Sequence, residues 1–157
     1  MDMIWNDYAL PCLCSFLACV GFTLVFNIHG MGKLICGVGG ALGWLVYLLA
    51  GSTIFAGFLA SAAIGLFSEV MSRLRRCPVT GYLLVALLPL VPGGGIYYAM
   101  SYCVSGETQK FLDALLHTFG MAAALALGAM LTSSLFRAAY PHLFGQKNRP
   151  KSTRGPI

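Results

Sequence analysis

Residues 87–98 read LLPLVPGGGIYY, inside a run that is otherwise suited to one long apolar helix. Pro89 and Pro92 each remove a backbone donor and clash with the carbonyl oxygen four residues earlier. The three glycines that follow each disfavour a helix by about 1 kcal/mol relative to alanine. The sequence therefore predicts two half-helices that meet at a break over Pro89–Gly95.

The chain around this segment is equally apolar. Of its 157 residues, 58% are hydrophobic and 10% are charged, whereas a soluble domain has roughly 25% charged residues. Residues 8–32, 34–68, 77–106 and 114–136 contain no Asp, Glu, Lys or Arg. A spanning helix needs about 20 apolar residues, and the longest run has a turn signal, Gly51-Ser52-Thr53, near its middle. We therefore expect an all-α, polytopic membrane bundle with spans near 8–26, 34–50, 53–71, 79–104 and 111–136.

The distribution of charge predicts the orientation of these five spans. With an outer N-terminus, nine of the ten basic residues fall on the inner side, and only Lys110 falls outside. Four of the five acids fall on the outer side, with Glu69 as the exception. The positive-inside rule thus favours N-out, C-in. The net charge of +5 is then explained by orientation and attraction to anionic lipid, and no nucleic-acid partner is expected.

The two ends of the chain support this organisation. Acidic residues stand near the N-terminus where a signal peptide carries positive charge, so we expect this segment to be retained as the first span. The transmembrane domain is expected over residues 1–140, followed by a basic cytoplasmic tail over 141–157. The cysteines have no metal-ligand spacing with a histidine and are interpreted as small packing residues. We therefore predict no metal and no cofactor.

Small residues recur at helical spacing in three of the predicted spans. The patterns are Gly39-xxx-Gly43, Gly57-xxx-Ser61-xxx-Gly65 and Gly120-xxx-Ala124-xxx-Gly128. Helices in lipid associate through close contact of small residues. These faces are expected to pack against protein, either within the chain or across an interface.

The interrupted span is the best candidate for a binding site. Backbone groups freed at membrane depth are tolerated only where protein or water satisfies them, and transporters use such discontinuous helices to bind substrates. The second half-helix would begin near Gly94 and present free N–H groups to an anionic group. The candidate substrate-binding residues are Asn27, Pro89, Pro92, Gly93, Gly94, Gly95, Tyr97 and Tyr98. The alternative is a packing kink without a ligand, and for Asn27 a helix cap.

Three ionisable side chains are candidates for proton coupling. Glu69 lies in an apolar run and is a functional candidate by default, although an ion pair with Arg73, solvated by water at the interface, explains it as well. Asp113 and His117 stand one helical turn apart and form either a proton relay or an ordinary interfacial pair. No nucleophile elbow, phosphate loop or metal cluster occurs in the sequence, so an enzyme is not predicted.

Several of these elements together resemble the threonine/serine exporter family. They are Val25-Phe26-Asn27, the glycine-rich second span, the small residues that end in Glu69 and Arg73, Pro78 after the basic loop, Pro89-x-x-Pro92-Gly93, and Tyr97 with Ala99-Met100. The likeness covers most of residues 10–140. It is closest to the C-terminal half of that family, which also occurs as a separate small subunit.

The resemblance implies a secondary exporter in the bacterial inner membrane, moving threonine and serine or a dicarboxylate such as succinate, with proton antiport as the energy source. It also implies a partner, a larger membrane subunit corresponding to the N-terminal half of the family. Five spans with an outer N-terminus would make the two halves inverted relative to each other, as in many transporters. A homo-oligomer is a further possibility. The rival interpretation is a membrane scaffold or assembly subunit that transports nothing.

Overall fold

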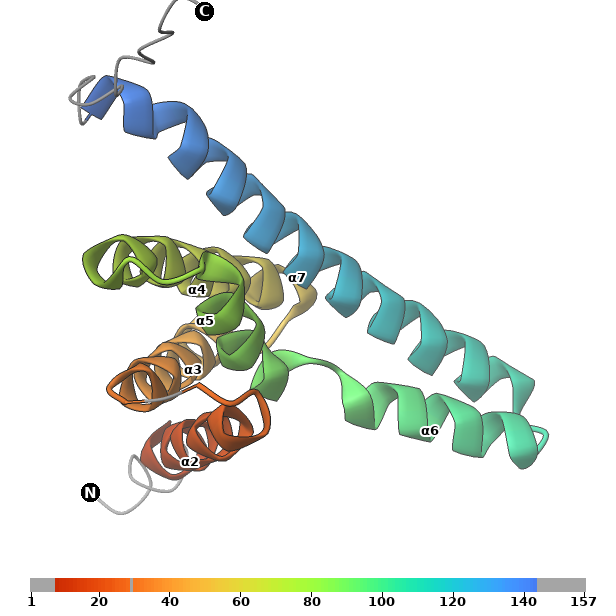
Figure 1. Cartoon of the computed structure of the whole chain (residues 1–157). Helices are drawn as coiled ribbons and strands as arrows, with labels where there is room; N and C mark the ends of the chain where they lie inside the picture. Colours follow the sequence, from red (N-terminus) through yellow and green to blue (C-terminus); the bar gives the residue numbers. More distant parts are fainter. Residues whose placement is uncertain (1–7, 29, 144–157) are drawn as a thin grey trace, which may run out of the picture.

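The computed structural model describes residues 8–28 and 30–143, and the regular elements in these residues are all helical (Figure 1). The elements are α2 (Leu10–Val25), α3 (Gly32–Leu49), α4 (Ile54–Arg75), α5 (Val79–Leu87), the short 3-10 helix η2 (Leu88–Leu90), α6 (Gly93–Val104) and α7 (Thr108–Leu143). The predicted all-α fold is confirmed. The last helix is longer than expected at both ends, and most of the predicted tail lies outside the described residues.

Three of these helices are long and apolar enough to cross a membrane, namely α3, α4 and α7. The pair formed by α5 with η2 and by α6 counts as a fourth span if it crosses as one bent unit. Helix α2 is apolar but has only 16 residues, a length of about 24 Å against roughly 30 Å of hydrocarbon. The chain is a multi-pass membrane protein, whereas the count of five spans and the N-out, C-in orientation stay predictions.

The helices form a bundle with one arm that leaves it. Helices α2, α3 and α4 pack side by side in chain order, and α5 packs against α3 and α4. Helix α7 runs diagonally along α4, while its first part pairs with α6 (Figure 1). Because Ile54 at the start of α4 approaches Gly120, and Gly95 in α6 approaches Thr118, α6 begins beside that end of the bundle. The rest of α6 extends away from α2–α5.

Short-range capping fixes the limits of the central helix, α4. The Thr53 hydroxyl accepts a hydrogen bond of 3.2 Å from the amide of Ala56, which caps the first turn. At the other end Arg76 adopts a left-handed conformation (φ 55°). The amide of Cys77 then donates to the carbonyl of Ser72 at 3.1 Å. These contacts end α4 with Arg73 and Arg75 in its last turn, where positive charge is favourable.

Glycines hold α4 and α7 in close contact. A Cβ atom at Gly57 would lie 2.7 Å from the Met121 sulfur, and one at Gly65 would lie 3.0 Å from Thr132. At Gly128 it would collide with Ser61 and with the main chain of α4. The predicted small-residue faces therefore pack against each other within the chain.

Glycines also allow close packing on two sides of helix α3. Gly40 faces the buried thiol of Cys19 in α2, and Gly43 faces Ile64 in α4. Gly39 approaches Phe67 of α4 and Ala86 of α5. Three neighbours can therefore approach one helix closely, and this packing supports the part of the chain that carries the break.

Replacing Gly128 by alanine should destabilise the chain, because the new Cβ would lie 2.5 Å from the Phe58 carbonyl oxygen. A backbone atom cannot move aside as a flexible side chain can, so we expect a loss of about 1–3 kcal/mol. Thermal unfolding in detergent measures it. Gly21→Ala is the matched control, since nothing lies within 4 Å of a Cβ at that position. Equal melting temperatures for the two variants would contradict the packing described here.

Candidate functional site: the break between α5 and α6

The chain changes direction between Leu90 and Gly93. Residues 88–90 tighten into a 3-10 turn, Val91 is extended (φ −60°, ψ 127°), and Pro92 stands at the N-cap of α6. The two half-helices are bent by 47°. The predicted break between Pro89 and Gly95 is confirmed, and α6 begins at Gly93. That the two half-helices cross the membrane as one span stays a prediction.

The bundle supplies substitutes for the hydrogen bonds that the prolines remove. Because residue 89 has no N–H, the carbonyl of Val85 lacks its usual helical donor. The fully buried thiol of Cys19 donates to that carbonyl instead, at 3.3 Å. The carbonyl of Leu88, which Pro92 deprives in the same way, accepts from the amide of Val91 at 3.2 Å. Hydrogen bonds to the Val85 and Leu88 carbonyls therefore stabilise the break.

The first part of the break lies inside the bundle. Pro89 borders a pocket of about 360 Å³, together with residues of α2 and with Trp44 of α3. Leu90 is buried and lies 3.4 Å from a Cβ built at Gly43. The indole nitrogen of Trp44 is buried, and no partner for it occurs in the described residues. An unpaired donor therefore stands beside the break.

The second part of the break presents main-chain amides. The amide of Gly93 bonds to the Val91 carbonyl at 2.7 Å and that of Ile96 to the Pro92 carbonyl at 3.3 Å. The two amides between them, at Gly94 and Gly95, have no acceptor within a helix, and no side chain caps α6. Free N–H groups at a helix start attract an anionic group such as a carboxylate.

Tyr97 and Tyr98 lie on α6 but turn away from the bundle. Their side chains are 71% and 60% exposed, and their rings meet edge to face at a centroid distance of 5.6 Å. They can therefore contact a solute only if it approaches from outside this chain.

The structure does not bring Asn27 to the break. Asn27 follows α2 in a left-handed conformation (φ 55°), while the amide of Ile28 bonds to the Thr23 carbonyl. This is the geometry of a helix end. The part of α2 beside Pro89 ends at Ala18, about 14 Å along the helix axis from Asn27. His29, two residues after Asn27, lies outside the described residues.

Glu69 is buried near the end of α4. Its carboxylate is paired with Arg73 at 3.5 Å, and the Arg73 guanidinium lies over the Phe136 ring at 5.2 Å. The ion pair that the sequence suggested is present, but the expectation that water solvates both partners was wrong, since Glu69 is only 1% exposed. The hydroxyl of the neighbouring Ser68 is buried and has no partner in the described part of the chain.

Asp113 and His117 are exposed near the other end of α7. Asp113 lies 23 residues before Phe136, about 35 Å along the helix, so these side chains are remote from Glu69. No hydrogen bond or ion pair joins Asp113 to His117 in the described structure. The three coupling candidates therefore do not form one relay within this chain.

Sequence reasoning missed the side chains that other helices bring to the break. They are Ser15, Cys19, Trp44 and Thr118. The rule for proline predicts that the Val85 carbonyl needs a new donor, but it cannot name the helix that supplies one. Thr118 is buried against Gly95 and donates to the Ala114 carbonyl at 2.6 Å. Nothing in the sequence identifies that contact.

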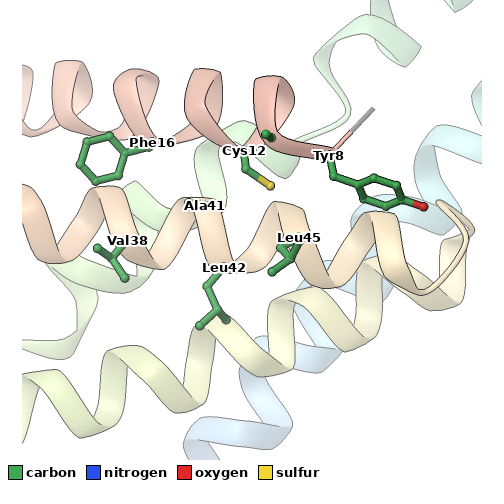
Figure 2. A pocket seen from close by; sticks show the side chains of 8 residues that line it. Tyr8, Cys12, Phe16, Val38, Ala41, Leu42 and Leu45 are labelled. Carbon is green, nitrogen blue, oxygen red and sulfur yellow. The ribbon is translucent and has the colours of Figure 1, made fainter. Parts of the chain in front are cut away.

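A groove of about 550 Å³ lies elsewhere, between α2 and α3 (Figure 2). Its lining is apolar apart from the Tyr8 hydroxyl and the Cys12 thiol. None of the predicted substrate residues borders it, so it is not the candidate site. Among the described residues, no group of three His, Cys, Asp or Glu side chains could hold a metal ion.

Comparison with known proteins assigns the fold to a family. The family described as "Threonine/Serine exporter, ThrE" matches residues 11–135, which include the whole break and all the helices except the first residue of α2 and the end of α7. The chain belongs to the threonine/serine exporter family. Membership in this exporter family supports a role in membrane transport and confirms the resemblance seen in the sequence.

An uncharacterised protein of Haemophilus influenzae (strain ATCC 51907 / DSM 11121 / KW20 / Rd) is 27% identical over 142 residues. The match covers 88% of this chain but 48% of the relative. This exporter-family chain therefore spans about half the length of the curated relative that it matches. No solved structure shows significant similarity to it.

Proposed function

We propose that the chain is one half of a two-component secondary exporter in the bacterial inner membrane, and that the break between α5 and α6 binds the substrate. The substrate is a small polar metabolite, either threonine and serine or a dicarboxylate such as succinate. One observation carries the proposal. A chain of the exporter family has a helix that starts, uncapped, at a break next to its bundle.

The chemistry of the break suits a carboxylate, which all of these metabolites share. The amides of Gly94 and Gly95 point along the start of α6 without helical acceptors, and the Trp44 indole adds an unpaired donor beside Pro89. Neutral donors bind a carboxylate less tightly than a buried cation does, so releasing the carboxylate costs less free energy. Weak, reversible capture of this kind is what an exporter needs.

Energy coupling is assigned to Glu69. It is the one acid among the described residues whose side chain is buried, and a carboxylate in a membrane helix is costly unless it is paired or protonated. Arg73 pairs with it at 3.5 Å and is itself 35% exposed. A proton that reaches Glu69 from the end of α4 that carries Arg73 can neutralise the carboxylate in place of the ion pair. The charge of Glu69 is then linked to the conformation of the transporter.

The second component is a larger membrane subunit. The curated relative has about as much chain again as the part that matches here. In a two-component exporter that other half is a separate protein, inverted in the membrane relative to this chain. Transport is the expected activity, with no enzymatic step. A scaffold without transport activity would leave metabolite levels unchanged on deletion, whereas an exporter's loss causes one metabolite to accumulate in the cell.

Gly93→Leu should abolish export while the protein still inserts into the membrane. A Cβ at Gly93 has no described atom within 4 Å, so the fold tolerates a side chain there, but leucine would fill the space in front of the α6 amides. Efflux of labelled threonine, serine and succinate from loaded cells measures the effect, and we expect at least a tenfold loss. Val104→Leu, at a 91% exposed position on the same helix, should keep the wild-type rate. Wild-type efflux from a well-expressed Gly93→Leu variant would remove the basis for this site.

Glu69→Gln should uncouple export from the proton gradient, because the amide cannot take up and release a proton as a carboxylate does. Efflux driven by an imposed pH difference is expected to fall at least tenfold in vesicles. Substrate exchange without a gradient should persist. Glu107→Gln is the control, since Glu107 pairs with Lys110 in an exposed position near the start of α7. If Glu69→Gln responds to the gradient as the wild type does, Glu69 is not the coupling group.

A further inference from the structure

Two glycines of the break have no explanation among the residues that the structure describes. The turn glycines adopt positive φ values, and the packed glycines would collide with neighbours if they carried a Cβ. Gly93 and Gly94 do neither, since nothing lies within 4 Å of a Cβ at either position and neither has a positive φ. Alanine there would favour the helix. Glycine is used where another backbone or a ligand approaches closely, and none of the described residues fills the space in front of Gly93 and Gly94.

A row of small exposed residues on α2 extends this surface. Cys14, Ala18 and Gly21 are exposed and share one helix face at spacings of four and three residues. Cys14 and Ala18 border the same pocket as Pro89, and a Cβ at Gly21 also meets nothing. We call the combined surface the open face, which consists of Cys14, Ala18, Gly21, Pro89, Gly93 and Gly94.

Lipid cannot cover the open face. The amide of Gly94 has no helical acceptor, and Gly94 is exposed. Uncapped backbone of this kind occurs in membranes only where protein or enclosed water satisfies it. Among the described helices, α6 makes extensive contacts with α7 alone, so the described residues leave the α6 side of the break uncovered.

The chemistry of the open face fits a membrane helix. It carries no charged side chain, and small residues at helical spacing allow two helix backbones to approach closely. The curated relative carries, joined to the part that matches this chain, a further segment of similar length. In that relative, the unmatched segment is therefore long enough to cover such a face.

From these observations we infer that the open face is the interface with a membrane subunit corresponding to the half of the relative that lies outside the match with this chain. The substrate path then runs between the two subunits, with the α6 amides on one wall. Tyr97 and Tyr98, which point away from this chain, face the partner across the path. The inference rests on the two-component part of the proposed function and adds the surface through which the components meet.

Photo-crosslinking in the membranes of the native cell tests this interface. Tyr97, 71% exposed, is replaced by the photoreactive aromatic p-benzoylphenylalanine, and the adducts are identified by mass spectrometry. The expected product joins this chain to a polytopic protein whose sequence aligns with the unmatched half of the Haemophilus influenzae relative. Phe55 in α4, 65% exposed, serves as the matched control position and should give at least tenfold less of that product.

A second substitution in the same chain tests the close approach. Gly94→Leu should lower the yield of the Tyr97 adduct at least tenfold, whereas Ser101→Leu, at an exposed position further along α6, should not. An adduct of this chain with itself, an adduct with lipid only, or equal yields from Tyr97 and Phe55 would overturn the inference. The outcome is separable from transport. A specific adduct in a chain whose Gly93→Leu variant exports normally would support the interface and refute the proposed substrate site.

Discussion

The hydrocarbon core of a membrane provides no water to pair with a main-chain N–H or C=O group. The fold is organised around one place, the break between α5 and α6, where helical hydrogen bonds are missing. Two prolines interrupt the helical ladder between Val85 and Pro92. The bundle satisfies the Val85 carbonyl with a buried thiol from α2, whereas the amides at the start of α6 are left without a helical acceptor. The first side of the break is held by the bundle, and the second side is the one to which we assign the proposed binding of substrate.

Close packing makes the structural side possible. Cys19 reaches the Val85 carbonyl because Gly40 lets α2 approach α3, and Leu90 is buried because Gly43 leaves room beside Ile64. The contact between α4 and α7 depends on glycines in the same way. The α6–α7 hairpin, by contrast, extends past the end of α4, so the uncapped amides lie at the edge of the bundle rather than within it.

The sequence predicted the helices and the break well, because both follow from local rules. Uncharged runs give the length of a span, and Pro89, Pro92 and three glycines preclude a continuous helix. It could not predict which side chains from distant helices reach the break. Cys19 was interpreted only as a packing residue, and Trp44 and Thr118 gave no signal. Burial of Glu69 also depends on the packing of α7 across α4, which no local pattern encodes, so the pair with Arg73 was foreseen but its burial was not.

We propose that the amides of Gly94 and Gly95 are free to meet a polar solute. Hydrogen–deuterium exchange of the protein in lipid nanodiscs, resolved at residues 91–98, measures this. These two amides are expected to exchange at least a hundredfold faster than those of Gly40–Gly43 in α3, and a transported carboxylate should slow them. Exchange at Gly94 and Gly95 as slow as in α3, with no response to any candidate substrate, would show that the amides are not available to a solute.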